Sequence, residues 1–141
     1  MSRERGFGTA TWMIGVAVVV LPLVLALLSM PRWYERADLA RGLAREVASV
    51  VVRSESLTSG LATADELVAA AAAGAGLSSA PGCREGCIAY SVTGDLNRGE
   101  YVTARVTVDL PDLVIPFAGS ISVGSWAAVH AERVEDLRSL P

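Results

Sequence analysis

The most prominent pattern in this chain is a long apolar stretch near its N-terminus. No charged residue occurs from Gly6 to Pro31, and the segment from Met13 to Met30 contains eleven leucine, isoleucine or valine residues. At about 1.5 Å per helical residue, this length suffices to cross a hydrocarbon layer of about 30 Å. The sequence therefore predicts a basic leader over residues 1–6 and a transmembrane helix in the lipid bilayer over residues 7–31.

Pro22 lies in the middle of the apolar stretch, where it removes a backbone donor and predicts a kink that a bilayer helix can tolerate. The stretch could also be the core helix of a soluble protein or a cleaved secretory signal. A core helix that is this long and apolar on all sides is uncommon in so short a chain. The segment ALLSM offers a poor signal-peptidase site, and the stretch exceeds a usual signal core. Membrane insertion is therefore the favoured interpretation.

The arginines around the stretch bear on its orientation. Two precede it and four follow it closely, namely Arg3 and Arg5, then Arg32, Arg36, Arg41 and Arg45. A literal count places the C-terminal part inside the cytoplasm. The following arginines are interleaved with acidic residues, however, and the cysteine pair suits an oxidising compartment. We therefore expect a single-pass protein of the cytoplasmic membrane with its C-terminal part outside the cytoplasm.

The next segment, residues 32–56, predicts an amphipathic helix. Apolar residues recur there at spacings of three and four, at Trp33, Ala37, Ala40, Ala44, Val47 and Val51. Pro31 is compatible with a first helical turn and with a bend where the membrane helix continues into this one. The small alanines permit the close approach of another backbone. That backbone belongs either to another subunit's helix or to the chain's own sheet.

Residues 57–82 predict a linker and a short helix. Thr63 and Glu66 match a capping box at the start of the segment TADELVAAAAAG, and Gly74 is placed to end the helix. The flanking segments RSESLTSG and GAGLSSAPG have the composition of exposed connections.

Residues 83–141 predict a small antiparallel sheet, because the apolar period there changes to two. The first strand contains Ile88, Tyr90 and Val92, the second runs from Val102 to Leu110, and the turn GDLNRGE joins them. After a link bracketed by two prolines, a third strand is expected through Ile121, Val123, Ala127, Val129 and Ala131. One apolar face of such a sheet needs a cover, which the amphipathic helix supplies. The predicted fold class is α+β, with an N-terminal transmembrane helix continuing into an amphipathic helix that packs on a three-stranded antiparallel sheet.

Composition and charge narrow the possible functions. The chain has 141 residues, of which 52% are hydrophobic, and its mean hydropathy of +0.43 exceeds that of an ordinary soluble domain. Its formal net charge is -3, so it has no general attraction for phosphate backbones, and no nucleic-acid partner is expected.

Candidate chemistry is sparse. Cys83 and Cys87 are the two ends of the segment CREGC, which suits a disulfide, two reduced thiols or, least well, a zinc site. His130, the one histidine, shares a strand face with Trp126 and has no partner acid or base nearby in sequence. No motif of a hydrolase, zinc protease or nucleotide-binding enzyme occurs. We expect no catalytic site, no cofactor and no metal.

The N-terminal third resembles a known family. The segment RERGFGTATW, the apolar stretch with its internal LP, and the segment WYERADLARGLAREVASVV are similar to the small TadE-like pseudopilins of tight-adherence (Tad) type IV pilus systems. Members share a basic leader ending in glycine, a hydrophobic helix that continues into an alanine-rich amphipathic helix, and a small β-rich end. The alanine rhythm corresponds here to Ala37, Ala40 and Ala44. The resemblance covers about the first fifty residues.

The resemblance implies a function, partners and site residues. A prepilin peptidase would cleave after Gly6 and leave Phe7 as the new N-terminus. Members usually carry glutamate at the fifth position of the mature chain, before a tryptophan, whereas this chain has Thr11 before Trp12. With Pro22 and the three alanines, these two residues are the expected assembly positions.

The resemblance also implies a pilin-like fold. The expected function is that of a structural minor pseudopilin or accessory subunit, with other pilus subunits and the assembly platform as partners, and with a place in a surface pilus. The alternative is a single-pass, membrane-anchored binding domain outside the cytoplasm that never joins a filament.

Overall fold

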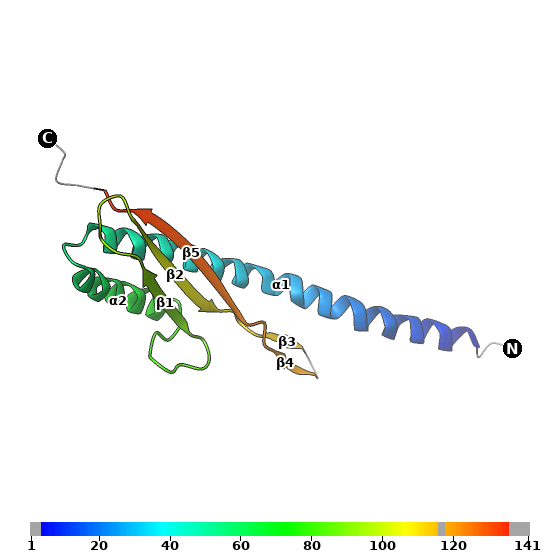
Figure 1. The fold of residues 1–141 in the computed structure, drawn as a ribbon. Helices are drawn as coiled ribbons and strands as arrows, with labels where there is room; N and C mark the ends of the chain where they lie inside the picture. The colour runs from blue at the N-terminus through cyan, green and yellow to red at the C-terminus, as the bar shows by residue number, and fades with distance from the viewer. Residues whose placement is uncertain (1–3, 116–117, 136–141) are drawn as a thin grey trace.

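The computed structural model describes residues 4–115 and 118–135. Its first element, α1 (Glu4–Arg53), is one helix of 50 residues that contains both Pro22 and Pro31. Figure 1 shows it as an unbroken rod, half of which extends beyond the rest of the molecule. The expected membrane and amphipathic segments therefore lie in one continuous helix, which has no break at Pro31 and ends at Arg53 rather than at residue 56. Each proline removes only one backbone hydrogen bond, and the surrounding bonds of the helix maintain its path.

The second helix, α2 (Leu57–Gly74), starts earlier than predicted. Its N-cap is Ser56, whose side chain accepts a hydrogen bond from the backbone N–H of Ser59. Thr63 lies inside the helix and donates its hydroxyl to the carbonyl of Ser59, so the predicted capping box is wrong. A serine cap about two helical turns upstream of Thr63 satisfies the first free N–H groups instead. The predicted end at Gly74 is confirmed.

A three-stranded antiparallel sheet follows, in the order β1-β2-β5. It contains β1 (Ile88–Thr93), β2 (Tyr101–Asp109) and β5 (Ser125–Arg133). In this register, Val106 of the central strand lies opposite Tyr90 on one side and Ala128 on the other. The predicted hairpin of the first two strands and the three-stranded antiparallel arrangement are confirmed. Residues 116–117 and 136–141 of the predicted sheet region lie outside the described residues.

The third predicted strand is corrected in two ways. Its first part, around Ile121, belongs to a separate two-stranded hairpin of β3 (Leu113–Ile115) and β4 (Gly119–Ile121). In β5 the predicted core face is inverted, since Ala128 is buried whereas Val129 is 62% exposed. The register with β2 is the physical reason for this inversion. Ala128 pairs with the buried Val106, and Val129 pairs with the exposed Arg105.

The core lies between the sheet and a layer formed by the C-terminal half of α1 and by α2 (Figure 1). Its largest fully buried side chains are valines from all these layers, namely Val47, Val51, Val68, Val102, Val106 and Val108. At about 0.8 kcal/mol per buried methylene, such side chains supply most of the driving force for folding. The observed architecture is α+β, with a long N-terminal apolar helix, a second helix and a small antiparallel sheet.

Candidate membrane and assembly surfaces

Among the described residues, most of the exposed large apolar side chains lie on the N-terminal half of α1. It includes an 18-residue window that is long and apolar enough to cross a membrane, and none of that window is buried within the chain. Every residue from 8 to 21 is exposed. A water-exposed apolar surface of this size needs lipid or protein to cover it. The window therefore has the properties of a membrane anchor.

The predicted processing and assembly residues lie along this half of the helix. Gly6 and Phe7 belong to the first turns of α1. Thr11 is exposed, Trp12 is 69% exposed, and both line a shallow groove beside Gly8 and Gly15. Pro22 is partly buried further along the helix. Thr11 and Trp12 are therefore on the surface, where another molecule can reach them.

The alanine stripe has a different place. Ala37, Ala40 and Ala44 are at most 7% exposed, and Ala40 and Ala44 belong to the main core cluster. They pack against the chain's own sheet and α2, which is one of the two possibilities that the sequence left open. Because their surface is already used inside the subunit, they are not available to another subunit's helix in this fold.

Sequence reasoning missed a group of aromatic contacts where the exposed half of α1 meets the folded part. The indole N–H of Trp33 donates to the carbonyl of Pro111, at 3.2 Å. The guanidinium of Arg41 lies 5.7 Å from the ring centroid of Trp126, within range of a cation-π contact. The partners are 78 and 85 positions apart, so no local pattern in the sequence could indicate either contact.

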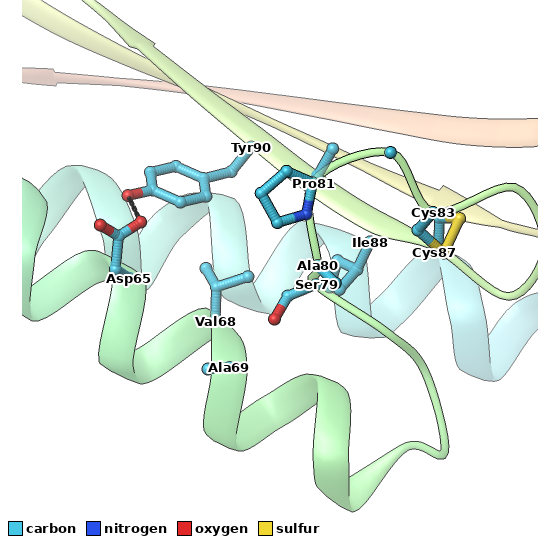
Figure 2. A pocket seen from close by; sticks show the side chains of 12 residues that line it. Asp65, Val68, Ala69, Ser79, Ala80, Pro81, Cys83, Cys87, Ile88 and Tyr90 are labelled. Carbon is cyan, nitrogen blue, oxygen red and sulfur yellow. Dashed lines mark hydrogen bonds between the residues drawn. A yellow bond between two sulfur atoms is a disulfide. The ribbon is translucent and has the colours of Figure 1, made fainter.

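A cavity of about 580 Å³ lies between α2 and the start of β1. Figure 2 shows Tyr90 and Asp65 at one end of it and the Cys83–Cys87 disulfide at the other. The Tyr90 hydroxyl donates to the Asp65 carboxylate at 2.5 Å. Burial, then the hydrogen bond to Asp65 and its negative charge, raises the pKa of Tyr90 to about 12. At neutral pH the hydroxyl is therefore protonated and donates to Asp65 at one end of the cavity.

The two cysteines form a disulfide, with Cα atoms 5.8 Å apart, in agreement with the first of the three predicted states. Its loop is held against the end of the central strand. The backbone N–H of Cys87 donates to an Asp109 carboxylate oxygen at 2.9 Å, and the backbone N–H of Asp109 donates to the Cys87 carbonyl. The bridge therefore fixes the segment that leads into β1.

The remaining polar candidates do not converge. His130 lies on β5 opposite Ala104 and is partly buried. Within residues 4–115 and 118–135, no group of three or more histidine, cysteine, aspartate or glutamate side chains is placed to hold a metal ion.

Comparisons with protein-family models, with curated proteins and with solved structures give no match to this chain. The functional interpretation therefore depends on the geometry described above and on the N-terminal resemblance.

Proposed function

We propose that this protein is a membrane-anchored minor pseudopilin or accessory subunit of a Tad-type pilus or secretion assembly. The observation that carries the proposal is the continuity of α1. One helix extends from an apolar part that is exposed from residue 8 to residue 21 into a half that forms the spine of the folded domain. A subunit of this shape stands in a bilayer as a rod with a folded head.

A pilus subunit must exist both in the membrane and in the assembly, and the exposed N-terminal half of α1 suits both environments. In the membrane, lipid covers the apolar side chains. In an assembly, helices of other subunits replace the lipid, and small residues at their interfaces allow close contact. Gly8, Thr11 and Gly15 provide small side chains on one face of α1, next to the large Trp12. We therefore assign subunit contacts to this part of the helix and not to the alanine stripe.

The disulfide supports the proposed orientation. Disulfides persist in oxidising compartments outside the cytoplasm. A Cys83–Cys87 bridge is therefore compatible with a folded domain that is exported while the basic leader stays inside.

Mass spectrometry of the protein purified from cells with an active prepilin peptidase tests the proposal. We expect a mature chain that begins at Phe7, and an unprocessed chain when Gly6→Val is introduced. Gly42→Val is the matched control, because Gly42 lies far along α1 from the cleavage site and a Cβ added there meets no atom within 4 Å. A wild-type chain that retains Met1 or Ser2 in such cells would overturn the pseudopilin proposal.

One observation favours a second candidate, a membrane-anchored binding domain that is not assembled. The cavity beside Tyr90 lies between α2 and β1 on the folded head (Figure 2). Figure 1 shows both elements away from the N-terminal half of α1. This candidate predicts that Gly6→Val changes neither the mass of the purified chain, apart from the substitution itself, nor its amount in the membrane.

A further inference from the structure

The β3–β4 hairpin extends from the folded domain along α1 toward the N-terminal half of the helix (Figure 1). β3 packs against α1, and the hydrogen bond from the Trp33 indole to the Pro111 carbonyl holds the base of the hairpin at Trp33. The burial of α1 changes at the same place. All residues from 8 to 21 are exposed, whereas partly buried positions start at Pro22 and continue at Leu25, Ala26 and Ser29.

The length of the apolar stretch shows how deep this region lies. The 25 residues from Gly6 to Met30 span roughly 37 Å at 1.5 Å per residue, against a hydrocarbon thickness of about 30 Å. The stretch therefore exceeds the hydrocarbon by about five residues. The chain from Pro111 to Ile115 covers about 13 Å at 3.3 Å per residue, so a hairpin that starts at Trp33 lies level with this excess.

The uncharged composition of the hairpin and its exposed apolar side chains suit contact with lipid. No aspartate, glutamate, lysine or arginine occurs from Leu113 to Ala131. Val114 is 66% exposed and Ile121 is 53% exposed, although both are large apolar side chains. Tyr34, next to Trp33 on α1, is 65% exposed. Tryptophan and tyrosine are enriched at the level of the lipid headgroups.

We infer that the β3–β4 hairpin is an interfacial membrane anchor, which places Val114 and Ile121 in the headgroup region of the leaflet beneath the folded domain. The inference rests on the membrane anchoring in the proposed function, but not on assembly into a pilus. The hairpin stays at the interface because its outer backbone groups need water or headgroups as partners, which the hydrocarbon does not offer. Lipid is favoured over a protein partner because the hairpin is uncharged and continuous with the membrane-spanning surface.

Attachment through both the helix and the hairpin restricts the orientation of the folded domain more than the helix alone does. A helix alone leaves the folded domain free to tilt and rotate over the membrane. Since the hairpin contacts the same leaflet beside the helix, it sets the tilt of the domain and the side of α1 that remains open to other subunits.

Spin-label accessibility in the full chain, reconstituted at one molecule per phosphatidylcholine nanodisc, tests the inference. Nitroxides are attached at Val114→Cys and Ile121→Cys, with the native disulfide kept oxidised. Val129→Cys is the matched control, since Val129 has nearly the same exposure on the sheet, and Val18→Cys at the middle of the apolar stretch is the lipid reference. We expect the ratio of oxygen to nickel-chelate accessibility at the two hairpin sites to be several-fold higher than at Val129.

The contrary outcomes separate the hairpin anchor from the helix anchor. Hairpin sites that resemble Val129, while Val18 is in lipid, overturn the hairpin inference and leave membrane anchoring intact. Hairpin sites shielded from both reagents indicate a protein contact and also overturn it. If Val18 itself is open to the nickel chelate, the membrane anchoring in the proposed function is wrong.

Discussion

Tyr90 combines two roles at the edge of the core. Its ring packs against the buried cluster, while its hydroxyl reaches the Asp65 carboxylate on α2. Partial burial and the neighbouring negative charge both oppose ionisation of the phenol, which is why its pKa rises to about 12. The same contact ties α2 to β1, two elements that otherwise touch little.

Because the pKa of Tyr90 is raised on folding, the free energy of unfolding should depend on pH through the ionisation of this residue. The folded chain holds this proton more tightly than the unfolded chain, in which a tyrosine has a pKa of about 10. The stabilisation is therefore complete below about pH 10 and is lost as the pH rises toward 12. We expect Tyr90→Phe to destabilise the chain by about 1 kcal/mol at pH 8, and this difference to shrink at pH 11. Thermal unfolding of the full chain in detergent micelles measures it.

Asp65→Asn serves as the companion variant. It removes the charge but not the burial, so part of the pH dependence should remain. If wild type and Tyr90→Phe lose stability in parallel between pH 8 and pH 11, the assigned role of Tyr90 is wrong.

At the scale of elements, the contact between α1 and α2 depends on Gly60. This residue is buried, and a Cβ placed on it would collide with the Ser54 Oγ and lie 3.0 Å from the Val51 Cα. Because Val51 presents backbone at this point, the helices cannot relax by a rotamer change alone. Gly60 therefore sets how closely α2 approaches α1 after the turn that joins them.

Gly60→Ala is expected to destabilise the chain. Alanine is favoured over glycine in a helix by roughly 1 kcal/mol, but overpacking at a backbone contact costs about 1–3 kcal/mol, so the net loss is about 1 kcal/mol. Gly42→Ala in α1 is the control, since nothing lies within 4 Å of the added atom. That variant should be unchanged or more stable in the same chemical denaturation experiment. Equal effects of both variants would contradict the close contact.

Two elements differ from the patterns predicted for them. Thr63 and Glu66 match a capping box, yet α2 begins at Leu57, where the local hydrogen bond from the Ser59 N–H to the Ser56 side chain caps it. In β5, apolar residues occupy both faces, so alternation alone could not show which face is buried. The hydrogen-bonded register with β2 determines which face of β5 is buried, because it places Ala128 beside Val106.

At the scale of the whole molecule, the two halves of α1 have opposite surroundings. The C-terminal half is the spine of the core, whereas the N-terminal half contributes almost nothing to it (Figure 1). Substitutions of exposed valines should therefore have effects that depend on the half of the molecule in which they lie.

Val18→Asp combined with Val19→Asp is expected to release the chain from the membrane. Each aspartate at the centre of a membrane helix raises the free energy of insertion by about 2.5–3.5 kcal/mol. Two aspartates therefore offset the several kcal/mol that the apolar stretch contributes to insertion. The control is Val129→Asp with Ala127→Asp, a pair of exposed positions on the outer face of β5. That pair should leave the protein in the membrane fraction after carbonate extraction. Retention of the Val18/Val19 variant would contradict the assignment of the span.

The sequence by itself determined the features that depend on local composition and period. These are the apolar stretch that suits a membrane, the alternation that forms β1 and β2, and the spacing that lets Cys83 bridge Cys87. Only the tertiary structure decided that Ala40 and Ala44 are used inside the chain, that β5 buries Ala128, and that the β3–β4 hairpin lies beside α1. Each of these depends on pairing between segments far apart in sequence. A local period reveals that a face is apolar, but not which surface will cover it.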